Sequence, residues 1–280
     1  MNLTEQQLRF FTTFGFLHFP GLFANDIDRI TKSFEQAWGN HGGGHLGQAH
    51  DHKRRSALVP FIDQDEYLCT LLDDKRLDDI ACAILGDDYN YTLSDGNFYV
   101  GDTYWHSDFS RPKPTIKAAF YLDEVTRDSG CLRVIPGSHN LEDAFRTSLD
   151  HMMSSQRKQS AEETLGIHGS EVPGFPLEST PGDLVCFDRR IKHASFGGGT
   201  RRRMFTIVLE PRYRDDELDI LRANIGNLSR FWAKRAYGDI MINTADQKRM
   251  VHLEQRLAHD DHLAELTCIA KRQMDEPARG

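Results

Sequence analysis

The sequence has few cysteines, and their spacing forms no recognisable framework. The five are scattered and odd in number, and no Cys-x-x-Cys motif occurs. This pattern argues against a disulfide framework and a zinc ribbon, so we expect reduced, mostly packed thiols. They are Cys69, Cys82, Cys131, Cys186 and Cys268.

Long apolar runs and an excess of basic residues are missing as well. No apolar stretch approaches the roughly 20 residues that cross a bilayer, and the first residues, MNLTEQQLRFF, lack the basic segment and apolar core of a signal peptide. The net charge of −8 argues against a general nucleic-acid binder. We therefore expect a cytoplasmic protein that binds neither nucleic acid nor a membrane.

Three His-x-acid pairs occur, close to the number expected by chance from 13 His and 42 acidic residues. Only His106 and Asp108 lie in an extended segment, where residues two apart point to the same face and can reach one metal ion. The other pairs lie in VHLEQRLAHDDHLAEL, which predicts one helix with solvated surface positions. These pairs are His252 with Glu254 and His259 with Asp261.

His193, in the segment PGDLVCFDRRIKHAS, is the natural third partner for His106 and Asp108. Two imidazoles and one carboxylate from distant segments form the ligand set of a non-haem Fe(II) oxygenase, which leaves coordination positions open. Four more histidines lie in NHGGGHLGQAHDHK, but three consecutive glycines there favour a mobile loop over a metal site.

The order of predicted elements indicates the fold. Thr4 and Gln7 form a capping-box pattern before a helix that runs to Gly15, and a second amphipathic helix is expected from about residue 25 to 38. From about residue 90 to 210, short β-rich segments alternate with Gly and Pro, without βαβ alternation and with one helical stretch at 141–165. This predicts a mainly β fold with flanking helices, a double-sheet jelly roll.

We divide the chain into a jelly-roll domain with N-terminal helical support over residues 1–210 and a helical C-terminal extension over residues 211–280. The extension is expected to pack on the same domain or to make a dimer contact, so the protein is a monomer or a homodimer.

Basic residues gather near the predicted metal ligands in an otherwise acidic chain, which would concentrate an anionic small-molecule substrate. Exposed loop charge is the alternative interpretation. Candidate substrate contacts are Arg111 and Arg133, together with Asn97 and Tyr99, which alternate before the metal segment. The basic cluster comprises Arg111, Lys113, Lys117, Arg133, Arg189, Arg190, Lys192, Arg201, Arg202 and Arg203.

The sequence resembles the phytanoyl-CoA dioxygenase family of Fe(II)- and 2-oxoglutarate-dependent oxygenases. The resemblance covers residues 1 to about 210, and four segments follow in the family's order: LTEQQLRFFTTFGFLHFPGLF, YWHSDF, YLDEVTRDSGCLRVIPGSHN and PGDLVCFDRRIKHAS. It implies a double-stranded β-helix, Fe(II), and the cosubstrates 2-oxoglutarate and O2, with ascorbate as a reductant. By the family's pattern, His106, Asp108 and His193 are the catalytic metal ligands.

The same resemblance implies that an Arg about ten residues after the second His binds the far carboxylate of 2-oxoglutarate. We favour Arg203, which directly precedes a predicted strand, with Arg202 as the alternative. A guanidinium suits this task because its fork of donors matches a carboxylate and stays charged in a dry pocket. Thr115 and Lys117, on the strand after the metal segment, are further candidates for contacting the cosubstrate.

The predicted activity is hydroxylation of an unactivated C–H bond with release of succinate and CO2. Two alternatives remain open: a metal-binding jelly-roll protein without turnover, and a cupin-like metal hydrolase. His139 is expected to serve a structural role in a Pro-Gly-Ser-His turn, and Trp105 to pack beside the first ligand.

Overall fold

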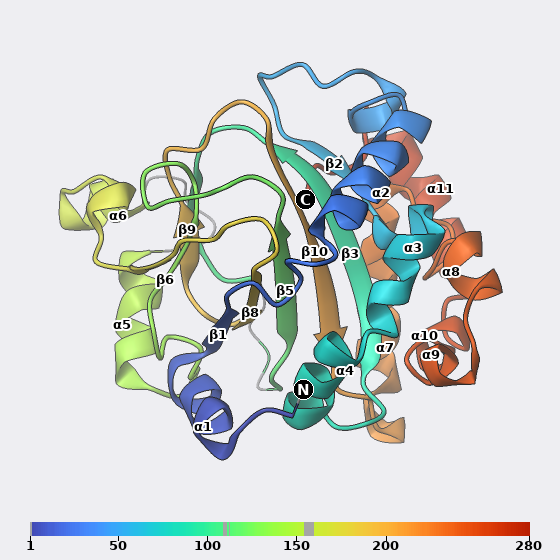
Figure 1. Ribbon diagram of the computed structural model, residues 1–280, viewed down its shortest axis with the longest axis horizontal. Coiled ribbons are helices and arrows are strands. Elements are labelled where there is room, and N and C mark those ends of the chain that lie inside the picture. Colours follow the sequence, from blue (N-terminus) through green and yellow to red (C-terminus); the bar gives the residue numbers. More distant parts are fainter. Residues whose placement is uncertain (1, 109–110, 112, 154–159) are drawn as a thin grey trace. The chain divides into compact units, whose positions relative to one another are not determined.

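The computed structural model describes residues 2–108, 111, 113–153 and 160–280 (Figure 1). The described chain forms two compact units. The sandwich unit contains residues 3–25 and 99–204, and the helical unit contains residues 26–98 and 205–280. Residues 205–280 lie in one compact unit with residues 26–98, whereas we divided the chain at residue 210 and expected the later residues to pack on the same domain or to make a dimer contact.

The sandwich unit is built on two antiparallel sheets, as predicted. One has the order β1-β8-β5-β10 and the other the order β4-β9-β6-β7. The strands of the first are β1 Phe16–Phe19, β8 Leu184–Asp188, β5 Ile116–Tyr121 and the start of β10 Arg202–Glu210. Those of the second are β4 Thr103–His106, β9 His193–Ser195, β6 Leu132–Val134 and β7 Phe175–Leu177.

Helices complete the sandwich unit. Helix α1 (Glu5–Phe14) has the predicted capping box, in which the Thr4 hydroxyl accepts from the Gln7 amide and the Gln7 side chain accepts from the Thr4 amide. Gly15 ends the helix in the left-handed conformation that glycine adopts without strain. The predicted helical stretch at 141–165 contains α5 (Ala144–Met152) and α6 (Ser160–Leu165), while its residues 154–159 lie outside the described residues.

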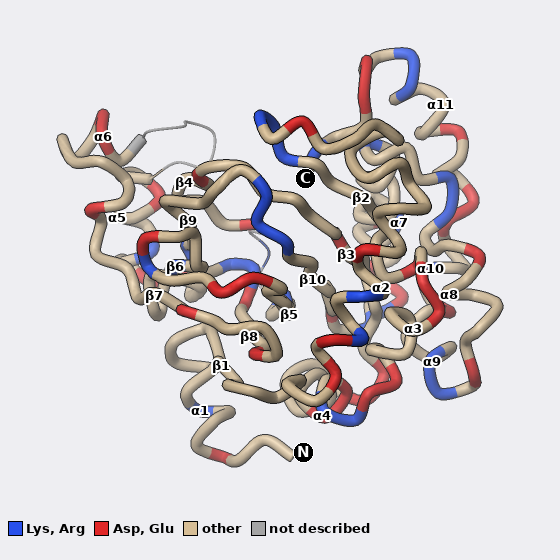
Figure 2. The backbone as a smooth tube through the Cα atoms, turned by 45° about the horizontal axis from the view of Figure 1, so that its top comes forward, with Lys and Arg blue, Asp and Glu red and all other residues tan. Residues whose placement is uncertain are grey.

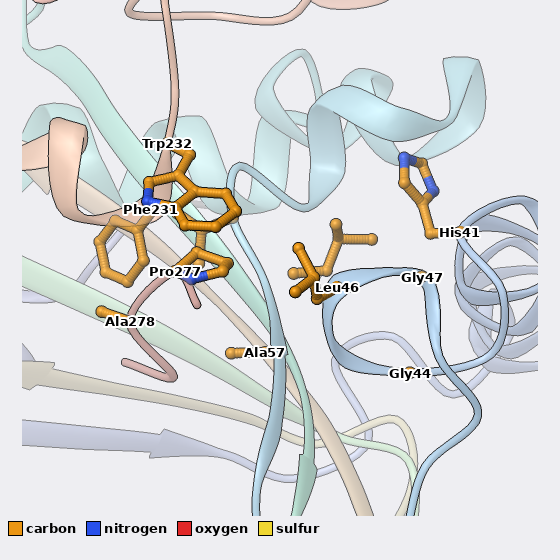
Figure 3. A pocket seen from close by; sticks show the side chains of 11 residues that line it. His41, Gly44, Leu46, Gly47, Ala57, Phe231, Trp232, Pro277 and Ala278 are labelled. Atoms are coloured by element: carbon orange, nitrogen blue, oxygen red, sulfur yellow. The ribbon is translucent and has the colours of Figure 1, made fainter. Parts of the chain in front are cut away.

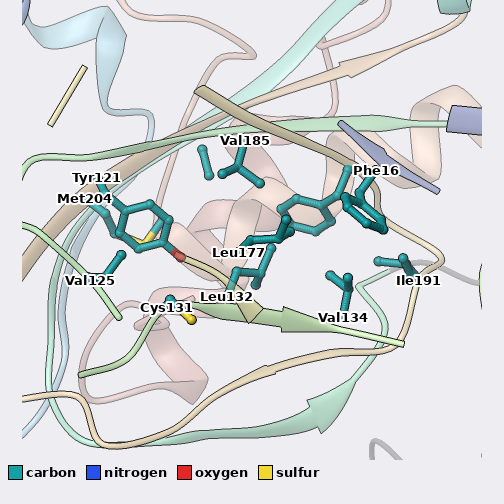
Figure 4. Packing of buried hydrophobic residues seen from close by; sticks show 12 residues of the cluster. Phe16, Tyr121, Val125, Cys131, Leu132, Val134, Leu177, Val185, Ile191 and Met204 are labelled. Carbon is teal, nitrogen blue, oxygen red and sulfur yellow. The ribbon is translucent and has the colours of Figure 1, made fainter. Parts of the chain in front are cut away.

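The core of the sandwich unit lies between its two sheets (Figure 4). Side chains from both sheets meet in one buried cluster, which is the expected result of alternating strand residues. Its members are Phe16, Ala119, Tyr121, Val125, Cys131, Leu132, Val134, Leu177, Val185, Phe187, Ile191 and Met204.

The helical unit contains strand β2 (Ser56–Leu58), most of strand β3 (Asn90–Tyr99) and the end of β10. Phe34, Trp38, Phe61, Phe98 and Phe205 form an aromatic cluster in its core. A side chain at Gly96 would overlap the Phe61 ring, because its Cβ would lie 2.0 Å from Cδ2.

The remaining elements of the helical unit are short. Its N-terminal part contains α2 Ile27–Asn40, η1 His45–Gly47, η2 Ile62–Gln64, α3 Glu66–Cys69, η3 Thr70–Leu72 and α4 Lys75–Leu85. Its C-terminal part contains η5 Asp215–Glu217, α7 Leu218–Gly226, η6 Asn227–Phe231, α8 Asp239–Asn243, α9 Gln247–Val251, α10 Glu254–Leu257 and α11 Leu263–Gln273. Among the described residues, no helix is long and apolar enough to cross a membrane.

The C-terminal segment corrects two predictions. VHLEQRLAHDDHLAEL forms parts of α9 and α11 with the short helix α10 between them, instead of one continuous helix. His252 is buried rather than solvated, because its ring stacks on Tyr89 at 3.8 Å and its Nδ1 lies 2.8 Å from the Tyr89 carbonyl oxygen. Periodicity cannot reveal such a tertiary contact.

Candidate metal centre

The three predicted ligands come together in the sandwich unit. Strand register places His106 of β4 directly opposite His193 of β9, and Asp108 follows two residues after His106. Asp108 Oδ1 lies 3.4 Å from His106 Nε2 and 3.7 Å from His193 Nε2. One ligand atom from each of the three residues lies within 4.8 Å of the other two, so one metal ion fits among them.

Backbone contacts fix both imidazoles in the orientation a metal needs. His106 Nδ1 lies 2.8 Å from the Tyr104 carbonyl oxygen, and His193 Nδ1 lies 3.0 Å from the Ile191 carbonyl oxygen. A carbonyl oxygen only accepts, so each Nδ1 carries the proton and each Nε2 presents its lone pair. Burial, with the nearby His106 ring, lowers the pKa of His193 to about 3, which keeps that ring in the neutral, metal-binding form.

Asp108 divides its two oxygens between different partners. Oδ1 faces the two histidines, while Oδ2 accepts a hydrogen bond of 3.0 Å from Lys117 Nζ. Burial alone raises the pKa of a carboxyl group, but the charge of Lys117, with smaller contributions from the two histidines, holds the pKa of Asp108 well below its usual value. Asp108 therefore stays ionised, and its Oδ1 is available as a single-oxygen ligand.

The open donors of Arg202 identify a second part of the site. Arg202 is 6% exposed, and its Nη2 donates to Ser195 Oγ at 3.2 Å. Its Nε and Nη1 are buried and have no hydrogen-bond partner in the described part of the chain. A buried guanidinium with unused donors is costly unless an anion satisfies it, so a carboxylate fits here.

Arg203 lies next to Arg202 but is already paired. Its Nε and Nη2 donate to Asp123 Oδ1 at 2.9 and 2.6 Å, and its backbone amide donates to Asp123 Oδ2 at 2.7 Å. Residue parity explains the difference, because Arg202 shares a strand face with Met204 of the sandwich core while Arg203 points the other way. The structure therefore favours Arg202 over our first choice. Figure 2 shows this basic run at the start of β10.

Ser195 is a site residue that the sequence analysis missed. It lies two residues after His193 on β9, so both side chains project to one face of the strand. Its hydroxyl accepts from Arg202, and position 195 lies about 7 Å along the strand from the second histidine. The same i, i+2 reasoning that paired His106 with Asp108 would have found it.

The other cosubstrate candidates lie in the sandwich unit. Thr115 is buried, and its Oγ1 has no hydrogen-bond partner among the described residues. It precedes Lys117 by two positions and so shares its face of the strand. Tyr99 packs against the sandwich core, and the Arg202 guanidinium carbon lies 5.1 Å from the centre of its ring.

Two substrate candidates have other partners. Arg133 pairs across the sheet with Ala194, on the face opposite His193, and its Nη1 and Nη2 each donate at 2.7 Å, to the Ser170 and Arg127 carbonyls. It therefore fixes backbone segments rather than lining the metal site, which corrects our expectation. In the helical unit, Asn97 is buried and its Oδ1 accepts two hydrogen bonds from Arg55, at 2.8 and 2.6 Å.

The remaining basic residues differ in their surroundings. Arg190 forms a two-point ion pair with Asp188, and Lys192 pairs with Asp150 at 2.6 Å. Arg111 and Lys113 are half-buried, and positions 109–110 and 112 around them lie outside the described residues.

Two expected structural roles are confirmed. Trp105 is buried and its Nε1 donates to the Gly169 carbonyl at 2.8 Å, on the sheet face opposite the ligands. His139 Nε2 lies 3.0 Å from the Thr12 carbonyl, and its ring packs so closely on Gly15 that a Cβ there would lie 2.6 Å from Nδ1.

The fold is shared with several solved structures. The carbocyclase SnoK from nogalamycin biosynthesis, described as non-haem and α-ketoglutarate dependent, is 20% identical, with 78% of this chain and 91% of SnoK covered at a TM-score of 0.57. HygX from Streptomyces hygroscopicus with bound iron is 16% identical, with coverages of 76% and 88% and a TM-score of 0.56. EctD from S. alaskensis with 2-oxoglutarate and 5-hydroxyectoine is 23% identical, with coverages of 75% and 76% and a TM-score of 0.53.

Sequence comparison gives the family. No curated protein sequence matches the chain. The model of the phytanoyl-CoA dioxygenase family matches residues 12–204, which is more than half of the chain and includes all three metal ligands. The protein therefore belongs to the phytanoyl-CoA dioxygenase family and is an oxygenase of the iron- and 2-oxoglutarate-dependent class.

Proposed function

We propose that the protein hydroxylates an unactivated C–H bond of a small anionic molecule, using Fe(II), 2-oxoglutarate and O2. The observation that carries this proposal is the presence of His106, Asp108 and His193 as one cluster, with the unsatisfied donors of Arg202 in the same unit. Iron with 2-oxoglutarate and O2 supplies the oxidation, and 2-oxoglutarate leaves as succinate and CO2. The protein's own residues supply orientation and charge.

His106, Asp108 and His193 would hold the metal on one side and leave the other side open. The two Nδ1 hydrogen bonds keep both rings from rotating away, and Lys117 keeps the second oxygen of Asp108 off the metal. Such outer contacts fix the ligands and tune their basicity. Asp108 also favours hydroxylation over halogenation, because related halogenases place chloride where this carboxylate stands.

Arg202 and Ser195 would bind the far carboxylate of 2-oxoglutarate. The carboxylate would satisfy the guanidinium donors that lack partners, and Ser195 would orient the fork toward it. Ser195 lies two strand positions after His193, a spacing of about 7 Å that suits a five-carbon dicarboxylate stretched from the metal to the arginine. Thr115, with its unsatisfied buried hydroxyl, is a further candidate for this pocket.

An anionic substrate is favoured by the cations near the metal segment, of which Arg111 and Lys113 are half-buried. The reaction itself is less constrained, because the similar structures include a carbocyclase, an epimerase and EctD with bound 5-hydroxyectoine. A cytoplasmic location and a monomeric or homodimeric state remain part of the proposal.

The test is an anaerobic titration of the metal-free protein with Fe(II) and 2-oxoglutarate, followed by the visible absorption band of the iron–2-oxoglutarate chelate. We expect the band in the natural protein, its loss in His106→Ala, and a weaker 2-oxoglutarate affinity in Arg202→Ala. Arg203→Ala is the matched control and should keep the natural affinity. A band weakened by Arg203→Ala but not by Arg202→Ala would reverse the assignment.

Two further results would change the proposed reaction. Metal binding without the band would favour a metal hydrolase or a binding protein without turnover. In a screen of matched compounds, succinate production stimulated only by neutral ones would refute the anionic substrate class.

A further inference from the structure

A cavity of about 220 Å³ lies within the helical unit (Figure 3). Four short segments form its walls: residues 41–47 around η1, residues 57–59 at the end of β2, residues 231–232 after α7, and residues 277–278 near the C-terminus. The cavity is larger than the roughly 150 Å³ engineered cavity that binds benzene in another protein. It has room for one ring with a small substituent.

Apolar groups dominate the lining. Leu46, Leu58, Phe231, Trp232 and Pro277 supply most of the large side chains, and Figure 3 shows the Trp232 ring and Leu46 on different walls. Among the described residues, no Lys, Arg, Asp or Glu lines the cavity, and His41 is the one ionisable side chain in its lining. A charged ligand would therefore lose its hydration without finding an oppositely charged side chain. A neutral apolar molecule would gain binding free energy from burial of its surface.

Backbone strain is concentrated at this cavity. Three non-glycine residues of the described chain have a positive φ: Leu46 at 55°, His52 at 57° and Trp232 at 62°. Two of the three, Leu46 and Trp232, line the cavity. Such a conformation is unfavourable for a residue with a side chain and persists only where the surrounding structure enforces it, which is typical of ligand-binding segments.

Hydrogen bonds between the walls enforce these conformations. His45 is buried in the η1 wall and connects it to two other walls. Its Nδ1 lies 3.1 Å from the Ala57 carbonyl oxygen, and its Nε2 lies 3.0 Å from the Pro277 carbonyl oxygen. The Ala278 amide donates to the Arg230 carbonyl at 2.8 Å, which ties the C-terminal wall to the one that carries Trp232. The cavity is therefore held open by polar contacts behind its apolar surface.

We propose that this cavity is a second small-molecule site, which binds a neutral ring compound of roughly seven to ten non-hydrogen atoms, judged from its volume. Leu46 forms part of its rim, because it is 48% exposed although it is a large apolar residue. This site does not depend on the proposed reaction, since none of its lining residues belongs to the metal cluster.

The experiment is ¹⁹F NMR of protein labelled with 5-fluorotryptophan, titrated with benzyl alcohol and separately with benzoate. The chain has three Trp, so three signals are expected, and Trp232→Phe identifies the one at the cavity. We expect benzyl alcohol to shift only the Trp232 signal, in a saturable manner, and benzoate to bind at least tenfold more weakly. Unchanged signals of Trp38 and Trp105 serve as the internal control for folding.

Two variants complete the test. Ala57→Leu fills the cavity and should abolish the saturable shift, while Leu46→Gly removes a wall and relieves the positive φ, and should weaken binding at least tenfold with the fold intact. The proposal is overturned if the Trp232 signal does not respond up to the solubility limit of benzyl alcohol. It is also overturned if a correctly folded Ala57→Leu protein binds as the natural one does, or if benzoate binds equally well.

Discussion

Asp63 of the helical unit and Asp108 of the sandwich unit are two aspartates whose pKa values are shifted in opposite directions. Asp63 of the helical unit is 2% exposed and receives hydrogen bonds from the Tyr91 hydroxyl at 2.7 Å and the Gly238 amide at 2.8 Å. Burial outweighs these contacts and raises the pKa of Asp63 to about 6. In the sandwich unit, the pKa of Asp108 moves the other way, although burial also acts on it.

The difference lies in the charge of the partners. Asp63 receives its hydrogen bonds from neutral groups, and Arg249, whose charge acts on it only weakly, is itself bound to Asp73. Asp108 has Lys117 on one oxygen and two imidazoles on the other. A carboxylate intended for a metal needs ionic support, whereas one that only joins backbone and side-chain donors does not.

The largest effect is expected from Asp108→Asn. The amide is neutral and is a poor substitute for the anionic ligand, so iron binding and activity should both be lost. Bound iron measured after anaerobic loading checks this. Asp63→Asn is the matched control and should load iron as the natural protein does; equal iron in both variants would contradict the assignment of Asp108.

Asp63 should make stability depend on pH in an unusual direction. Its folded pKa of about 6 lies above the ordinary aspartate value of 3.8, so the folded state binds the extra proton between these values, and the stability from this group falls as pH rises from about 4 to 6. The full change is about 3 kcal/mol. Urea unfolding of Asp63→Asn against the natural protein should show the variant gaining relative stability across that range. If the difference in free energy of unfolding between Asp63→Asn and the natural protein stays constant from pH 4 to 7, Asp63 has an ordinary pKa.

Lys117→Met tests the ionic support of Asp108. Loss of the ammonium should free the second carboxylate oxygen and weaken Fe(II) affinity by about 10- to 100-fold. Lys117→Arg, which keeps the charge, should recover part of that loss. Competition with a metal-sensitive dye measures both affinities, and an unchanged value in Lys117→Met would mean that the contact does not position the ligand.

The smallest effect is expected from Asp123→Ala, which removes the partially exposed carboxylate bound to Arg203. Such pairs contribute about 1 kcal/mol or less to the free energy of unfolding, so the unfolding temperature should fall only slightly. The iron–2-oxoglutarate band should be unchanged. Thermal unfolding together with the band checks this. A lost band would show that this pair supports the cosubstrate site after all.

Much of the metal centre could be predicted because its spacing is local. Alternation along an extended segment predicts that His106 and Asp108 project to one side, and the segment around His193 carries the family's pattern. The same alternation of residues along a strand would also have predicted Ser195. The choice between Arg202 and Arg203 could not be predicted in this way. It depends on which of the two arginines pairs with Asp123, a residue some eighty positions away in the chain.

Other predictions were wrong for similar reasons. The polarity of Arg133 and His252 suggested substrate contact and solvent exposure, yet one binds distant carbonyls and the other stacks on Tyr89.

The sequence by itself determined the β-rich sandwich, the capped first helix and the identity of the three ligands, because alternation, capping and motif spacing act over a few residues. Tertiary structure decided the opposite pKa shifts of Asp63 and Asp108, the unused donors of Arg202 and the strained cavity at Leu46 and Trp232. These depend on which groups from distant segments desolvate or neutralise one another, and no local pattern encodes that.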